Sequence, residues 1–210
     1  MSFIEEINID IDWRMSELAS LKTIPLRYNL LPEHKGLLIK YAVPSIYALW
    51  EGFVKNTFGF YIKEINKLQI PINEVHIDLL THTLSSHDKL CLENPRINYK
   101  TKKEFILLYQ TTISQPLRLT DKLPTKSNVN FDIINDILMR FNLKQLPKNE
   151  FNDRLNKLLN FRNKIAHGEK SISVKIEDIE IFSKLVNDLM VETLLRIESG
   201  YNSRTFLKTV

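Results

Sequence analysis

The sequence is poor in the residues on which several common functional sites depend. Its single cysteine, Cys91, excludes an internal disulfide and a CxxC motif, and it suits a reducing compartment. The five glycines lie too far apart to form a phosphate-binding loop, so Walker and dinucleotide-binding fingerprints are absent. An HExxH zinc motif is absent as well. We therefore expect no cofactor and no metal.

Long hydrophobic runs are also missing. No apolar run reaches the roughly 18 residues that a membrane-spanning helix needs. The first residues, MSFIEEINIDIDWR, carry acids where a secretory signal carries bases, so we expect a cytoplasmic protein with no membrane contact. The net charge of +4 is a mild preference for polyanions, and the positions of the bases matter more than their sum.

What the chain does have is apolar residues at helical spacing. We predict helices over residues 2–22, 34–68, 73–86, 131–141, 149–167 and 176–199, with Pro44 kinking the second. Residues 87–130 are irregular, and EFILLY within them suits a strand or a helix. The fold class is therefore all-α: an antiparallel bundle forming one domain, 1–210, with helix 2–22 as an extension.

The periodicity also predicts which side chains face inward. Trp50, Phe53 and Phe58 are expected in the core or in a dimer interface. The remaining predicted inward positions are Ile4, Ile7, Ile11, Met15, Leu18, Leu21, Ile39, Val43, Ile46, Tyr61, Ile65, Leu68, Phe151, Leu155, Leu158, Leu159, Ile165, Ala166, Ile179, Phe182, Val186, Leu189 and Thr193.

The stretch NFRNKIAHGEK, residues 160–170, breaks this pattern. Arg162 interrupts the apolar stripe, and His167 and Gly168 follow at the expected helix end. Asn163 and His167 are i, i+4 neighbours on one face, and Arg162 lies one step round the helix from Asn163. A structural interpretation is available: the arginine stem lies on the core with its head in water, the histidine complements the helix dipole, and the glycine ends the helix.

A chemical interpretation is equally concrete. Arginine is always charged and can bind a phosphate through two parallel hydrogen bonds, and histidine titrates near neutrality. His167 would take the proton from a ribose 2′-hydroxyl, which attacks the adjacent phosphorus while Arg162 stabilises the developing charge. The products are a 2′,3′-cyclic phosphate and a 5′-hydroxyl. The departing oxygen also needs a proton, which a second histidine across a two-fold dimer would supply.

At these residues the sequence resembles a known family. Arg162, four intervening residues and His167 resemble the R-x4-6-H motif of HEPN domains, in which the following asparagine and an AHG ending are also usual. The stretches YAVPSIYALWEGFVKN (41–56) and TKSNVNFDIINDILMRFNL (125–143) are similar to those of HEPN-like nucleases from bacterial defence and toxin loci. The resemblance covers about residues 30–200.

The resemblance implies an all-helical domain, homodimerisation through the motif helices and metal-independent endoribonuclease activity. Arg162 and His167 would be catalytic and Asn163 would support them. Such domains act as toxins or anti-phage effectors, with an antitoxin or defence-system protein as partner. Some relatives have lost catalysis and only bind a partner protein or nucleotide, which is the alternative here. A related toxin group has a modified tyrosine two residues after the histidine; this chain has Glu169 there, so we do not expect that regulation.

Other side chains are candidates for supporting roles. Glu51, among aromatic residues of the second helix, either pairs with Arg162 or another nearby base and orients it, or reaches water. Unpaired bases would stack on Tyr99 or Phe131, although Phe131 also suits the core. The basic residues that would form an RNA-binding surface, or else a solvated face, are Lys122, Lys126, Arg154, Lys157, Lys164 and Lys170.

One histidine cluster combines His76, His82 and His87 with Asp78 and Asp88. Asp78 and His82 are i, i+4 neighbours and could hold a metal on a helix, but the other spacings fit no standard site. We expect these residues to be a solvated helix face.

Overall fold

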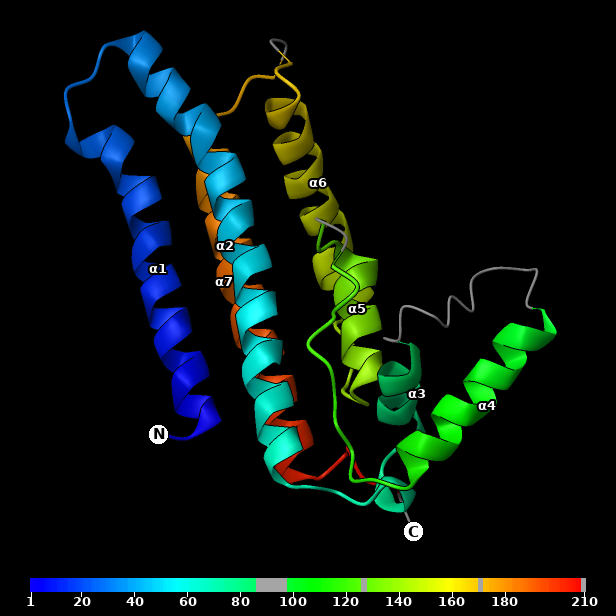
Figure 1. Ribbon diagram of the computed structural model, residues 1–210. Coiled ribbons are helices and arrows are strands. Elements are labelled where there is room, and N and C mark those ends of the chain that lie inside the picture. Colours follow the sequence, from blue (N-terminus) through cyan, green and yellow to red (C-terminus); the bar gives the residue numbers. More distant parts are fainter. Residues whose placement is uncertain (86–97, 126–127, 170–171, 209–210) are drawn as a thin grey trace.

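The computed structural model describes residues 1–85, 98–125, 128–169 and 172–208, in which helices and connecting segments account for the chain (Figure 1). No strand forms among these residues. The helices are α1 Phe3–Arg27, α2 Pro32–Lys67, η1 Ile72–Glu74, α3 Ile77–Ser85, α4 Tyr99–Ile113, α5 Phe131–Arg140, α6 Lys148–Ala166 and α7 Ile176–Asn202. The prediction of an all-α bundle is confirmed.

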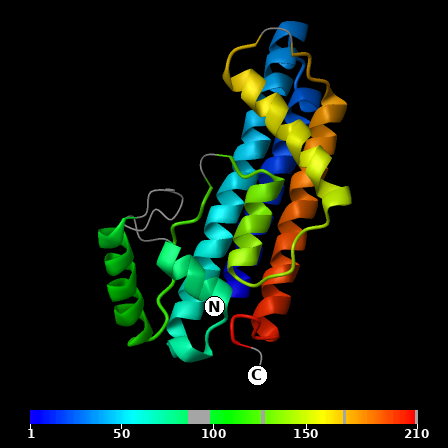
Figure 2. The ribbon, with the colours of Figure 1, turned by 90° about the vertical axis from the view of Figure 1, so that its right-hand side faces the viewer.

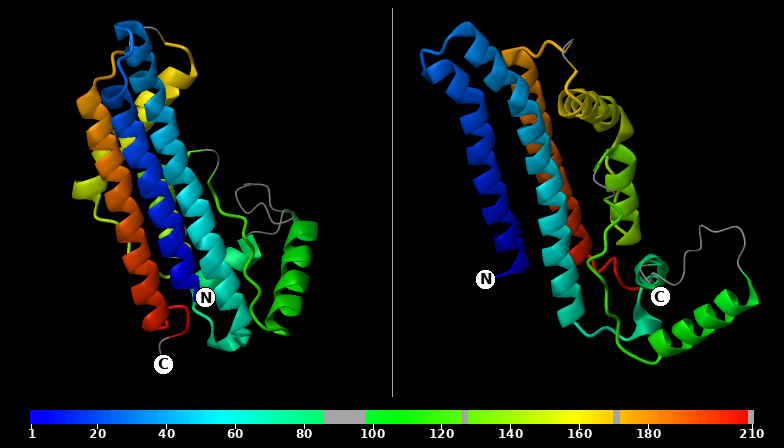
Figure 3. Two further views of the ribbon diagram at one scale, coloured as in Figure 1. Left: turned by 90° about the vertical axis from the view of Figure 1, so that its left-hand side faces the viewer. Right: turned by 45° about the horizontal axis from the view of Figure 1, so that its top comes forward.

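Helix α2 is the centre of the bundle. It packs against α1, α6 and α7, and Figure 3 shows α1, α2 and α7 side by side. Trp50, Phe53, Phe58 and Tyr61 of α2 are fully buried, so they belong to the core rather than to a dimer interface. Helix α1 contributes apolar residues to the same core and packs along both α2 and α7. Helix α6 lies inclined across the bundle, as Figure 2 shows.

Side-chain caps explain where several helices begin. The Ser2 hydroxyl accepts the Glu5 N–H at 3.2 Å, and the Glu5 carboxylate accepts the Ser2 N–H at 2.7 Å, which is a capping box. The Asn130 side chain accepts the Ile133 N–H at 2.8 Å, which confirms the predicted start of α5. The Asn98 side chain accepts the Thr101 N–H at 3.0 Å and begins α4, which contains EFILLY.

Helix α4 stands apart from the bundle. It has no buried residue, and Figures 1 and 2 show it projecting beside α3. Its outer face exposes Ile106, Leu107, Tyr109 and Ile113. Its apolar contact with the core is limited to the partly buried Phe105 and Leu108, so the sequence did not distinguish this helix from a strand.

Three of the inward-facing predictions are wrong. Met15 is 42% exposed, Leu68 lies just beyond the end of α2 and is exposed, and Ala166, the last residue of α6, is exposed. In α1 the inward position next to Met15 belongs to Arg14, which is buried. The Arg14 guanidinium lies 2.7 Å from the Asp10 carboxylate. This buried ion pair explains why an apolar pattern placed Met15 rather than Arg14 on the inner side of α1.

Arg14 also fixes how closely α1 approaches α2. Its Nη1 donates to the Leu49 carbonyl at 2.8 Å. A Cβ at Gly52 would lie 2.9 Å from the same nitrogen, so a glycine suits this crossing. Helix α2 continues through Pro44 from Pro32 to Lys67. No helix among the described residues is long and apolar enough to cross a membrane.

Candidate functional site

The end of α6 presents the histidine of the motif. Gly168, at φ +75°, follows His167, and its N–H donates to the Ile165 carbonyl at 3.0 Å. The Glu169 N–H donates to the Lys164 carbonyl at 3.0 Å, which completes a Schellman turn. A glycine is favoured here because other residues rarely adopt a positive φ. The turn leaves the His167 side chain exposed at the helix end.

The turn is tied to α2. The Lys40 ammonium donates to the Glu169 carbonyl at 3.0 Å. In Figures 1 and 3 the C-terminal end of α6 lies beside the N-terminal half of α2. The histidine end of the motif is therefore attached to the central helix of the bundle.

Arg162 is held by two other segments of the chain and by its neighbour in α6. Its guanidinium carbon lies 4.9 Å from the centroid of the Tyr47 ring in α2, within the range of a cation–π interaction. Its Nη1 donates to the Asn128 side-chain oxygen at 3.1 Å and to the Asn163 side-chain oxygen at 2.9 Å. Both acceptors are neutral amides, so these contacts orient the guanidinium without neutralising its charge.

Tyr47 is a fixed platform for Arg162. Its hydroxyl accepts the Val129 N–H at 2.6 Å, and Trp50 Nε1 donates to the Val129 carbonyl at 3.0 Å. Burial raises the pKa of Tyr47 to about 12; the Val129 hydrogen bond and Arg162 lower it, whereas Glu51 raises it further. The phenol is therefore neutral, and the ring offers its π face to the cation.

Glu51 lies one helical turn from Tyr47. Its carboxylate forms an ion pair with Lys55 at 2.6 Å, and its side chain is mostly buried. Glu51 thus pairs with a base of its own helix, and it also acts on Tyr47, whose pKa it raises. A supporting role for Glu51 stays a prediction.

The structure brings Arg162 and Asn163 into direct contact, and Asn163 uses its side-chain oxygen on the arginine rather than on the histidine. His167 lies one turn further along α6, where its backbone N–H donates to the Asn163 carbonyl at 2.9 Å. The partly buried guanidinium and the exposed imidazole thus belong to one helix end, and Asn163 lies between them in the sequence.

The predicted RNA-binding bases do not share one environment. Arg154 lies 3.7 Å from the Asp188 carboxylate and Lys157 lies 3.3 Å from that of Asp178, both on α7. Lys164 is half-buried near the end of α6. Lys122 lines a cleft beside α2 whose lining includes none of Arg154, Lys157 and Lys164. Lys126 and Lys170 lie outside the described residues.

The two stacking candidates differ in exposure. Tyr99 is exposed at the start of α4, whereas Phe131 is buried in the core and has no face available to a base. The core interpretation of Phe131 is therefore the correct one.

The histidine cluster is not the solvated face we expected. His82 is only 1% exposed because α3 packs against α5, and its ring centroid lies 5.1 Å from that of Phe141. Its Nε2 lies 3.1 Å from the Thr120 carbonyl, and burial lowers the pKa of His82. His76 lies 3.4 Å from the Asp78 carboxylate. The described part of the chain holds no group of three metal-binding side chains; His87 and Asp88 lie outside it.

Sequence reasoning missed Tyr47 and Asn128, which position Arg162. Both lie inside the two stretches that carry the family resemblance, 41–56 and 125–143, so the signal was present. Their link to Arg162 is a tertiary contact between distant segments, which no helical periodicity reveals.

A comparison with protein families agrees with the resemblance found in the sequence, and it extends over nearly the whole chain. The family model for HEPN domains of the MAE_28990-like type matches residues 3–206. The chain belongs to the HEPN family. HEPN domains are often ribonucleases, and they are typically dimeric and bind RNA. No curated protein and no solved structure matches this HEPN domain.

Proposed function

We propose that this HEPN domain is a metal-independent endoribonuclease that acts as a toxin or anti-phage effector. The observation that carries the proposal is the fixed position of Arg162. Its guanidinium is partly buried over the Tyr47 ring and bound by two neutral amides, five residues before an exposed histidine. The structural Arg14 is neutralised by a carboxylate, whereas the described residues that bind Arg162 are neutral and leave its charge for a ligand.

The contacts of Arg162 leave the edge that suits a phosphate. The two hydrogens of Nη1 bind Asn128 and Asn163, and no described residue takes the Nε and Nη2 hydrogens, which are available to a ligand. Two parallel N–H groups match two phosphoryl oxygens. In the proposed mechanism this edge stabilises the charge that develops at phosphorus, because fixed donors need no reorganisation during the reaction.

His167 would act as the general base. Its imidazole would take the proton of the ribose 2′-hydroxyl, whose oxygen then forms a bond to the adjacent phosphorus. The bond between phosphorus and the 5′-oxygen breaks, and this oxygen takes a proton from His167 of a second subunit. The products are a 2′,3′-cyclic phosphate and a 5′-hydroxyl end. No group besides protein side chains and RNA is needed for the balance of the reaction.

The exposed face of α2 beside the site supports a homodimer. Leu37, Tyr41, Pro44 and Ala48 recur at i, i+4, i+7 and i+11, so they share one face of the helix. Leu37 and Tyr41 are more than half exposed. Lys40, between them, holds the turn that follows His167. A two-fold interface through this apolar face would bury it and bring two motif ends together.

Cleavage of RNA in EDTA tests the proposal. Purified protein should cleave unpaired RNA in the presence of the chelator, and the products should carry 2′,3′-cyclic phosphate ends. His167→Ala should lower the rate about 10²- to 10⁴-fold, the usual contribution of a general base. Arg162→Ala should lower it by a similar factor. Arg27→Ala, which removes an exposed arginine at the end of α1, is the matched control and should cleave normally.

The outcomes separate the enzyme from the alternative. Activity that requires Mg²⁺, or that survives both substitutions, contradicts the proposed mechanism. Absence of cleavage over a panel of transfer, messenger and phage RNAs, with a folded dimer, selects instead a catalytically inactive HEPN module that binds a partner protein or nucleotide.

A further inference from the structure

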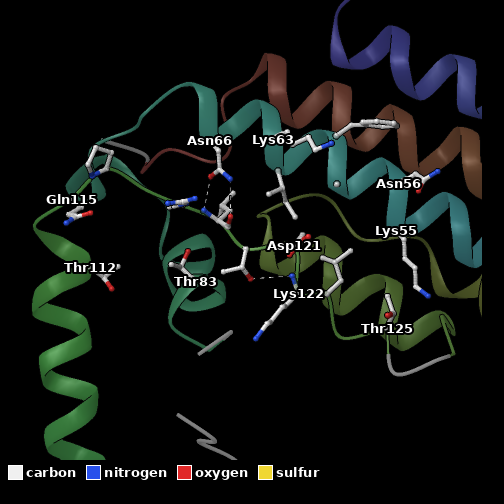
Figure 4. A pocket seen from close by; sticks show the side chains of 18 of the residues that line it. Lys55, Asn56, Lys63, Asn66, Thr83, Thr112, Gln115, Asp121, Lys122 and Thr125 are labelled. Atoms are coloured by element: carbon white, nitrogen blue, oxygen red, sulfur yellow. Dashed lines mark hydrogen bonds between the residues drawn. The ribbon is translucent and has the colours of Figure 1, made fainter. Parts of the chain in front are cut away.

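A second surface feature lies further along α2. It is an open cleft of about 1070 Å³ between α2, α3, α4 and the segment 115–125 (Figure 4). Ligand sites usually measure about 300 to 1,000 Å³, so this cleft accommodates more than a small metabolite. Helix α4 has no buried residue and serves as one wall.

The charge of the cleft suits a polyanion. Its lining includes four bases and one acid, Asp121; the bases are Lys55, Lys63, Arg118 and Lys122. Lys63 and Arg118 are exposed to solvent, whereas Lys55 forms an ion pair with Glu51. The neutral polar side chains that line the cleft and can donate or accept hydrogen bonds are Asn56, Asn66, Thr83, Thr111, Thr112, Gln115, Thr120 and Thr125.

The wall opposite α4 is preformed. The Asn66 amide donates to the Leu119 carbonyl at 3.0 Å and accepts the Leu119 N–H at 2.8 Å, bonds that Figure 4 draws as dashed lines. The Leu117 N–H donates to the Ile70 carbonyl at 2.8 Å. These bonds hold Leu117 and Leu119 against the end of α2 and the residue Ile70 just beyond it, so a ligand need not order this part of the wall on binding.

The cleft also has apolar surface that suits unpaired bases. Phe60 is half-buried in its lining, and Leu108 and Leu123 lie in the same cleft. A duplex keeps its base faces stacked inside, whereas an unpaired strand can place bases on such a surface and its phosphates on the cations. The mixture of apolar and basic side chains therefore favours a single strand.

The position of the cleft connects it to Arg162. Tyr47 lies beneath the guanidinium, Lys55 at the cleft edge follows it by eight residues along α2, and Lys63, another lining residue, follows Lys55 by eight more. The sixteen residues from 47 to 63 span about 24 Å of helix. A stacked strand covers this length with about seven nucleotides.

We propose that this cleft binds the unpaired RNA segment next to the bond that the Arg162–His167 site cleaves. The inference rests on the proposed function, because it makes the cleft a binding site for the substrate of that activity. It assigns Lys63 and Arg118 to the phosphates and Phe60 to a base.

Binding without reaction tests the cleft separately from catalysis. The probe is a fluorescent 2′-O-methyl RNA of about 12 nucleotides, longer than the proposed path and lacking the attacking hydroxyl. The double variant Lys63→Ala/Arg118→Ala should bind it about tenfold more weakly. The slope of log affinity against log salt should fall by about 1.4, because two phosphate contacts are lost.

The matched control is Lys102→Ala/Lys103→Ala, which removes two exposed charges of α4 outside the cleft lining. It should bind the probe with less than a threefold loss. Phe60→Leu keeps apolar packing but removes the ring; it should weaken binding and leave the salt slope unchanged.

Three results would overturn the proposal: equal loss of affinity in the two double variants, duplex RNA that binds as tightly as the single strand, or full competition by a mononucleotide. The last result would make the cleft a nucleotide site. Because the probe cannot be cleaved by attack of a 2′-hydroxyl, failure of the cleft and failure of the nuclease are distinct findings.

Discussion

Arg162 shows what one residue of this chain reveals by its position alone. A permanent cation at the border of an apolar stripe, followed by a histidine and a helix-ending glycine, predicts a polar group at the end of α6. The structure explains how the cation is accommodated: it lies over the Tyr47 ring and binds two amides. The spacing of the pair was readable because it is local. Tyr47 and Asn128, which contact Arg162, were not readable, because they come from other segments of the chain.

Asn128 gives a prediction at this scale. Asn128→Ala should leave the guanidinium with fewer fixed contacts and lower kcat several-fold, with little change in KM. Asn128→Asp should be more severe, at least about tenfold in kcat/KM, because a carboxylate would compete with the RNA phosphate for Arg162. Steady-state cleavage kinetics measure both. If Asn128→Asp were as active as the wild type, Asn128 would have no positioning role.

Single helices differ in how well the sequence predicted them. Those that face the core, α2, α5, α6 and α7, were found within a few residues, because burial imposes a period on their side chains. Helix α4 was ambiguous since none of its residues is fully buried, and one inward position of α1 was misassigned to Met15 since the neighbouring Arg14 is buried there with its charge. Hydrophobic periodicity arises from contact with a core. It therefore predicts a helix poorly where the helix buries little surface, and it misassigns an inward position that holds a buried ion pair.

The contact of α3 with the segment 115–125 predicts a pH dependence. Burial lowers the pKa of His82; the Thr120 carbonyl raises it, Arg140 lowers it and Asp136 raises it. The folded state therefore binds a proton less readily than the unfolded state, whose histidine titrates near pH 6.5. Stability is complete above that pH and falls as the pH decreases below it, until His82 also titrates in the folded state.

His82→Gln isolates this contribution. Glutamine can donate to the Thr120 carbonyl but does not titrate, so urea unfolding of the variant should depend less on pH between about 7 and about 5 than that of the wild type. His34→Gln, at an exposed histidine near the start of α2, should leave the pH dependence unchanged. Parallel curves for wild type and His82→Gln would contradict the assignment.

At the scale of the whole molecule, the proposed activity needs two subunits. Tyr41 is 55% exposed on the apolar face of α2, and Leu195 is 51% exposed on α7. Tyr41→Glu should shift the protein towards the monomer and lower cleavage by at least about tenfold, because a charge in an interface is costly to desolvate. Leu195→Glu changes a side chain of similar exposure on α7. It should alter neither the oligomeric state nor the rate of cleavage.

Sedimentation measures the shift towards the monomer, and cleavage of RNA in EDTA measures the loss of activity. A Tyr41→Glu protein that stays dimeric and active would place the interface on another face. A monomer that cleaves at the wild-type rate would show that one subunit supplies all the groups required, and would remove the second histidine from the mechanism.

The uninterrupted course of α2 has one more consequence. Below Pro44 the same rod of backbone carries Tyr47 and then the residues of the cleft, with no loop or hinge between them. The distance between the proposed RNA-binding cleft and the proposed cleavage site is then fixed by the number of residues that separate them along α2. On the proposed mechanism, cuts would fall at a fixed number of nucleotides from the RNA segment bound in the cleft.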